Sequence, residues 1–189
     1  FGVGRFDDYP YSPYGSSGDR AYVHLQDMSS SSAAAQTAVN GMSASGGNDG
    51  PESDIPALHA IATGCGDGTG SYAIPNDPDG ACTNPALIGY PHFRAGSVPI
   101  IVLITDAAFH NSPHGLNNYG SIPGVTPPSY AATVAALNAI HARVIGVNTS
   151  SAGGDLDALA RATGTVAAGV PLVYTISSTG SGLGTQLID

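Results

Sequence analysis

An uninterrupted run of apolar residues at positions 99–105 (PIIVLIT) constrains the fold more than any other part of the chain. The run is rich in β-branched residues and has no polar alternation, which is typical of a strand buried on both faces of a parallel sheet. It is far shorter than the roughly 20 apolar residues that a helix needs to cross a bilayer. The sequence therefore predicts a central strand of an α/β sheet.

Shorter segments on either side alternate between strand and helix patterns. Strands are predicted at residues 1–6, 22–25, 143–147 and 172–176, and helices at residues 33–42, 55–62, 130–141, 156–162 and 185–189. Strands and helices that alternate at this spacing favour a doubly wound, mostly parallel sheet with helices on both faces. We expect a single domain over residues 1–189, since this length suits one hydrophobic core.

The charge of the chain argues against several classes of partner. Five Lys and Arg residues against fourteen Asp and Glu residues give a formal net charge of −9. Such a chain is poorly suited to nucleic-acid phosphates or anionic lipid, and it lacks a long apolar run for membrane insertion. We therefore expect no nucleic-acid partner and no membrane insertion. Divalent cations are tolerated by an acidic surface of this kind.

The two cysteines, Cys65 and Cys82, enclose 16 residues rich in Gly, Asp, Asn and Pro. This loop is too irregular to form a helix or strand of its own. A disulfide across it would stabilise the fold by roughly 3 kcal/mol in the chain-entropy model. We predict that disulfide and, because one pair with no cysteine left over is typical of exported proteins, a secreted or cell-surface location. The alternative is two unrelated buried thiols.

Oxygen-bearing side chains follow the central strand and also precede a predicted helix. Asp106 comes directly after residues 99–105, at the strand end where open α/β sheets bind ligands. The acidic turn NDGPE at residues 48–52 carries Asp49 and Glu52. Oxygen ligands of this kind suit Mg²⁺ and Ca²⁺. Each group alone would be an ordinary turn or helix cap, but together they predict a cation site.

The same two stretches carry a family resemblance. GNDGPE at residues 47–52 and IIVLITDAAFH at residues 100–110 resemble segments of the von Willebrand factor A domain, in particular its integrin β-subunit version and bacterial relatives. FGVGRF at residues 1–6 resembles the second strand of that domain, so the resemblance spans nearly the whole chain. It implies an adhesion or binding module without enzymatic activity. Such a module recognises an acidic group on a protein or glycan partner through a bridging Mg²⁺ or Ca²⁺.

The resemblance also implies roles for individual residues. Glu52 and Asp106 match two ligands of the family's metal-ion-dependent adhesion site, and Asp49 matches a ligand of its neighbouring calcium site. We expect Glu52 and Asp106 to face each other at the carboxyl edge of the sheet. The family's first strand and its Asp-x-Ser-x-Ser loop would lie upstream of Phe1, on the same chain or on a separate one. Without that loop we expect weak binding, with a Kd of roughly 10⁻⁴ to 10⁻³ M.

A second stretch, DMSSS at residues 27–31, also fits the Asp-x-Ser-x-Ser pattern. Only 17 residues separate Ser31 from Asp49, which is too few for the elements that the family inserts there. We therefore interpret Asp27 and the serines as the end of a strand that runs into a serine-rich helix start. A true metal loop is the alternative.

Two other functions stay open at this point. Asp106, His110 and His114 are spaced by four residues and could form the metal triad of a hydrolase. Pro113 argues against the unbroken helix that this triad would need. The resemblance implies a structural hydrogen bond for His110 instead, because His110 matches a family position with that role. The remaining alternative is a structural module that binds no metal.

Overall fold

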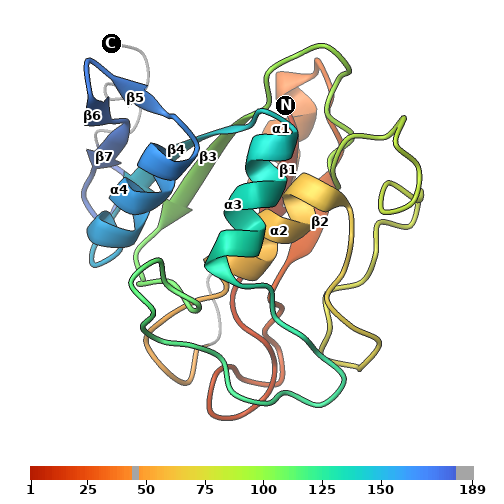
Figure 1. Ribbon diagram of the computed structural model, residues 1–189, viewed down its shortest axis with the longest axis vertical. Helices are drawn as coiled ribbons and strands as arrows, with labels where there is room; N and C mark the ends of the chain where they lie inside the picture. Colours follow the sequence, from red (N-terminus) through yellow and green to blue (C-terminus); the bar gives the residue numbers. More distant parts are fainter. Residues whose placement is uncertain (44–46, 182–189) are drawn as a thin grey trace.

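The computed structural model describes residues 1–43 and 47–181, which form a mixed α/β fold (Figure 1). Its main sheet has three parallel strands in the order β3-β4-β7. These strands are β3 (Ile100–Thr105), β4 (Arg143–Asn148) and β7 (Val173–Thr175). Because β3 and β4 pair along their whole length, from Ile100 with Arg143 to Thr105 with Asn148, their carboxyl ends lie at one edge of the sheet.

Three helices share one hydrophobic core with this sheet. They are α2 (Asp54–Thr63), α3 (Tyr130–Ala139) and α4 (Gly153–Ala162). Leu103 of β3 and Val144 of β4 point into that core and are buried against apolar residues of all three helices. Since Leu103 and Val144 belong to the same face of the sheet, the three helices cover that face.

Local sequence signals explain where several helices begin and end. Ser129 caps α3 by accepting a hydrogen bond from the backbone of Ala132. Gly64 ends α2 in the left-handed conformation, with a φ of 70°, which glycine adopts without steric cost. Ser31 caps the remaining helix, α1 (Ser32–Asn40).

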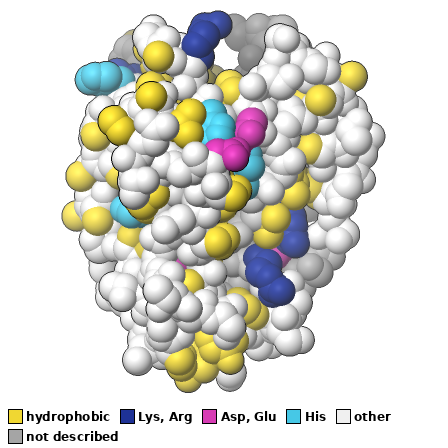
Figure 2. All heavy atoms as spheres, turned by 90° about the vertical axis from the view of Figure 1, so that its right-hand side faces the viewer, with side chains coloured by type: hydrophobic (Ala, Val, Ile, Leu, Met, Phe, Trp, Pro, Cys, Tyr) yellow, Lys and Arg dark blue, Asp and Glu magenta, His cyan; other side chains and the backbone are white. Residues whose placement is uncertain are grey.

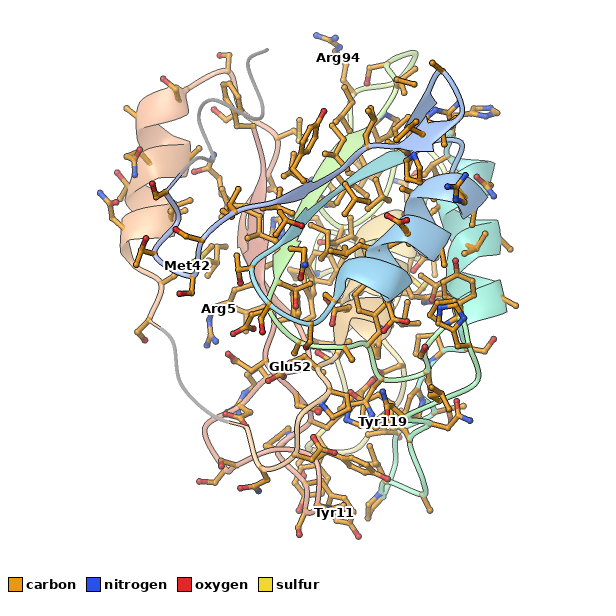
Figure 3. The ribbon with its side chains drawn as sticks, turned by 90° about the vertical axis from the view of Figure 1, so that its left-hand side faces the viewer. Arg5, Tyr11, Met42, Glu52, Arg94 and Tyr119 are labelled. Atoms are coloured by element: carbon orange, nitrogen blue, oxygen red, sulfur yellow. A yellow bond between two sulfur atoms is a disulfide. The ribbon has the colours of Figure 1, made fainter. Side chains whose placement is uncertain are left out.

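A separate antiparallel pair lies beside the main sheet. It consists of β1 (Val3–Arg5) and β2 (Val23–Gln26). Helix α1 packs against this pair, on the side of the molecule away from α3 and α4, as Figure 3 shows. A short antiparallel ribbon of β5 (Val166–Ala167) and β6 (Val170–Pro171) completes the strands of the described residues.

Most of the predicted elements are present, with their ends shifted by a few residues. The predicted helix at residues 185–189 lies outside the described residues. Strands β5 and β6 were not predicted. Because the predicted helices within the described residues are present and β3, β4 and β7 form a parallel sheet, the predicted fold class is confirmed as mixed α/β. The doubly wound arrangement remains a prediction, because α2, α3 and α4 cover one face of the sheet while α1 packs on β1 and β2.

The prediction that residues 99–105 are buried on both faces is wrong. Ile100, Val102 and Ile104 are 63%, 42% and 48% exposed, whereas Leu103 is 5% exposed. Residues that alternate along a strand point to opposite faces of the sheet. The core therefore buries only the face that carries Leu103.

The predicted disulfide between Cys65 and Cys82 is confirmed. It closes the loop that follows α2, which forms turns rather than helix or strand over most of its length. In the part of the chain that the structure describes, no helix has the length and apolar character needed to span a membrane.

Candidate metal centre

Three segments far apart in the sequence meet beyond the carboxyl end of β3. The acidic turn runs beside the segment after β3, since the backbone N–H of Glu52 donates to the carbonyl of Ala108 at 2.9 Å and that of His110 donates to the carbonyl of Glu52 at 2.8 Å. The segment after β1 joins them through Ser53, whose backbone N–H and hydroxyl both donate to the carbonyl of Asp7. Figure 3 shows Glu52 at the end of the molecule where the loop that carries Tyr119 also lies.

A buried carboxylate of α4 fixes the segment after β3. Asp155 accepts hydrogen bonds from the backbone of Phe109 and from the hydroxyl of Ser112, both at 2.9 Å. Phe109 is completely buried in the core below. The backbone on either side of His110 is therefore held in place from inside the fold, independently of any ligand.

Glu52 lies among other negative charges. Burial, and after it the charges of Asp8, Asp7, Asp19 and Asp106, together raise its pKa from 4.5 to about 7. Its Oε2 atom is buried and has no hydrogen-bond partner. A carboxyl group in this environment favours either a proton or a cation.

Asp8, Asp49 and His110 form the tightest group of ligand atoms at this edge, because one ligand atom from each lies within 4.8 Å of the other two. The Nε2 atom of His110 is 3.1 Å from Oδ2 of Asp8 and 3.3 Å from Oδ2 of Asp49. Burial lowers the pKa of His110, but the hydrogen bond and charge of Asp8, with further contributions from Asn117 and Asp49, outweigh it and raise the pKa overall. The imidazole of His110 thus lies between two carboxylates that favour its protonated form.

Aromatic side chains hold this group in place. Tyr119 stacks on the ring of His110 with 4.1 Å between ring centroids, and its hydroxyl donates to Oδ1 of Asp8 at 2.6 Å. The Nδ1 atom of His110 lies 2.7 Å from the carbonyl of Asn117. The structural hydrogen bond expected for His110 is therefore present, and its other ring nitrogen faces the carboxylates.

Several buried carboxylate oxygens here lack any hydrogen-bond donor. Among the described residues, the buried side-chain polar atoms without a partner include Oδ1 of Asp19, Oε2 of Glu52 and both carboxylate oxygens of Asp54, while the buried Oδ2 of Asp8 has only the imidazole of His110 beside it. Burial also raises the pKa of Asp54 well above its ordinary value. Burying an unpaired carboxylate lowers the stability of the fold. Protonation of these groups or a bound cation would remove that cost in free energy.

The residues predicted from the sequence are brought to this edge to different degrees. Asp49 belongs to the tight group, and the half-buried Glu52 lies within range of the charge of Asp8. Asp106 lies at the same edge with an exposed side chain, and its charge acts on Glu52. Neither Glu52 nor Asp106 is within the 4.8 Å group, so a cation shared by these two carboxylates stays a prediction.

Asp8 and Asp54 were missed. Asp8 is the second residue after the predicted strand at residues 1–6, much as Asp106 is the first after the strand at 99–105, and this position near a strand end was the available signal. Asp54 resembles an ordinary acidic residue in the first turn of a helix, and only its complete burial sets it apart.

The two alternative ligand sets are not assembled as the sequence allowed. Strand β2 ends at Gln26 and Ser31 caps α1, as the strand-to-helix interpretation of residues 27–31 requires. The hydrolase triad is not assembled, because His110 contacts Asp8 and Asp49 while the exposed His114 lies 3.9 Å from Asp155. Residues 110–118 form turns rather than a helix.

Neither the scan against protein-family models nor the search of curated proteins finds a match to this chain.

Proposed function

We propose that this chain is a von Willebrand factor A-like binding module, which recognises its partner through a divalent cation held beyond the carboxyl end of β3. The observation that carries the proposal is the set of buried carboxylate oxygens without a partner on Asp19, Glu52 and Asp54, beside the group of Asp8, Asp49 and His110. A bound cation would offset the negative charge of this edge without protonating each carboxyl group.

Once the imidazole of His110 moves out from between Asp8 and Asp49, the donor set consists of carboxylate oxygens and favours a hard cation. Asp8 and Asp49 offer carboxylate oxygens close to each other, and Glu52 and Asp106 lie at the same edge. Mg²⁺ and Ca²⁺ prefer such ligands and commonly complete their coordination with water. One of these waters can be replaced by an acidic group of a protein or glycan, so that partner binding depends on metal and involves no catalysis.

Cation binding at this site competes with protons. The ring of His110 lies between Asp8 and Asp49, which favour its protonated form, and Glu52, with its pKa raised to about 7, keeps a proton to a higher pH than an ordinary carboxyl group does. An incoming cation therefore displaces protons from the cluster. We expect Mg²⁺ and Ca²⁺ affinity to increase from pH 6 to pH 8.

The wider setting of the proposal is a secreted or cell-surface protein. The disulfide between Cys65 and Cys82 is the feature that supports this location, because such bonds persist in oxidising compartments. In the family that the chain resembles, helices cover both faces of one sheet, and the proposal includes that doubly wound arrangement for this domain.

Calorimetry with Ca²⁺ or Mg²⁺ tests the proposed function. The chain by itself should bind with a Kd of roughly 10⁻⁴ to 10⁻³ M, and Asp49→Asn should weaken this binding at least tenfold. Asp157→Asn, which removes an exposed charge on α4, is the matched control and should change nothing. Absence of binding by the native chain, at pH 8 and millimolar metal, would instead favour a structural module.

A further inference from the structure

A second group of metal-ligating side chains lies apart from the edge described above. Asp27 follows β2, Asp79 belongs to the disulfide-closed loop, and His92 follows that loop. One ligand atom from each lies within 4.8 Å of the other two. The group has no residue in common with Asp8, Asp49 and His110. Figure 2 shows histidine and acidic side chains gathered on the face of the molecule that it views.

His92 is oriented by a carboxylate outside the group. Its Nε2 atom lies 3.0 Å from Oδ2 of Asp77, which is 5% exposed and also accepts a hydrogen bond from the backbone of Ala81 at 2.9 Å. When Nε2–H donates to Asp77, the lone pair of the ring is on Nδ1, which lies 3.7 Å from Oδ2 of Asp27. Metal-binding histidines usually have this arrangement, in which the second ring nitrogen donates to a carboxylate.

Asp27 is oriented in the same way. The Nε2 atom of His24 lies 2.7 Å from Oδ1 of Asp27, and its Nδ1 lies 3.2 Å from the hydroxyl of Tyr22. Because the tyrosine hydroxyl can donate to Nδ1, Nε2–H is directed at Asp27, and Oδ2 of Asp27 is left for another ligand. Two of the three ligands thus have outer partners that fix their orientation.

The segments that carry these ligands are tied to one another without a metal. The disulfide closes the loop of Asp79, and the backbone N–H of Asp77 anchors that loop by donating to the carbonyl of Gly64 at 2.8 Å. The backbone N–H of Met28 donates to the carbonyl of Pro91 at 2.9 Å, which joins the segment of Asp27 to that of His92. Such a framework limits the ordering cost of binding.

We propose that Asp27, Asp79 and His92 bind a transition-metal ion of the Zn²⁺ type. Mg²⁺ and Ca²⁺ prefer oxygen ligands alone, whereas an imidazole nitrogen with carboxylates suits Zn²⁺ and related ions. Three protein ligands leave a tetrahedral ion one position for water or for a donor from another molecule. The side chains of Asp27 and Asp79 are exposed, so that position faces solvent. This site goes beyond the proposed adhesion function and does not depend on it.

Calorimetry with Zn²⁺ on the metal-free chain at pH 7.5 tests this site. We expect one Zn²⁺ per chain, with affinity reduced at least tenfold by Asp79→Asn and by His92→Gln. Asp79→Asn is the sharper variant, because Asp79 is exposed and the change keeps its shape. His141→Gln, which removes an exposed histidine elsewhere, is the matched control and should leave Zn²⁺ affinity unchanged. A native thermal midpoint for each variant shows that the fold is intact.

The outcomes separate this site from the first one. Asp49→Asn should reduce Ca²⁺ binding and leave Zn²⁺ binding as it is, and millimolar Ca²⁺ should not compete with Zn²⁺. Zn²⁺ binding that persists in Asp79→Asn, that is lost in Asp49→Asn, or that is absent from the native chain would overturn the proposal.

Discussion

At the scale of single residues, Glu52 is the side chain whose environment is most informative. Its pKa is raised from 4.5 to about 7, first by burial and then by the nearby aspartates. The folded chain therefore holds a proton on Glu52 more tightly than the unfolded chain does. By linkage, the stability that this group contributes is fully present below about pH 4.5 and is lost as the pH rises to about 7.

The pH dependence of Glu52 can be measured by thermal unfolding without metal. Between pH 5 and pH 8 the unfolding midpoint of the native chain should fall more than that of Glu52→Gln, because glutamine mimics the neutral carboxyl at every pH. Adding Ca²⁺ at pH 8 should raise the midpoint of the native chain more than that of the variant. If the unfolding midpoints of the two proteins changed equally with pH, the pKa of Glu52 would not be raised in the folded chain.

The residue scale also shows what one sequence can and cannot reveal. Asp49 and Glu52 were found because they lie in one short acidic turn, and Asp106 because it ends an apolar strand. Asp8 pairs with His110, which is about a hundred residues further along the chain. A contact across that distance depends on the tertiary fold, and no local pattern marks it.

At the scale of elements, β3 has one buried face and one exposed face. Its sequence is apolar on both, so alternation could not distinguish them. The strands and helices were predictable because their apolar periodicity and serine or glycine ends are local signals. The two-residue strands β5 and β6 are too short to produce such a signal.

Substitutions at two neighbouring positions of β3 compare the contributions of its buried and its exposed face to stability. Leu103→Ala should destabilise the fold by about 2 to 5 kcal/mol, since it leaves a cavity in the core shared with α2, α3 and α4. Val102→Ala, on the exposed face, should cost less than about 1 kcal/mol. Urea unfolding of both variants provides the comparison. Similar losses for the two would mean that the outer face of β3 is covered in solution.

At the scale of the whole molecule, the disulfide and the carboxylate edge represent two different kinds of stabilisation. The disulfide limits the unfolded chain, and its loop was predictable from the turn-forming residues between Cys65 and Cys82. At the carboxylate edge, by contrast, buried carboxylates repel one another, and a bound proton or cation reduces that repulsion. The long loop at residues 65–82 has little regular structure and depends on the disulfide. The carboxylate edge is consistent with a metal-dependent binding site.

Removal of the disulfide should therefore have a defined cost. The double substitution Cys65→Ser and Cys82→Ser is expected to lower the free energy of unfolding by roughly 3 kcal/mol. Guanidinium unfolding of the native and the doubly substituted chain checks this value. A loss well below 1 kcal/mol would indicate that contacts of the loop with the core, rather than the crosslink, order residues 65–82.

The central claim is that a divalent cation fits among Asp8, Asp49 and Glu52. The most direct measurement is anomalous scattering from crystals of the chain soaked with Mn²⁺, which stands in for Mg²⁺ and Ca²⁺ and can be located by its signal. We expect a peak about 2 to 2.6 Å from carboxylate oxygens of Asp8 and Asp49, with the imidazole of His110 displaced from between them. A fully soaked crystal without a peak near any oxygen of Asp8, Asp49 or Glu52 would contradict it.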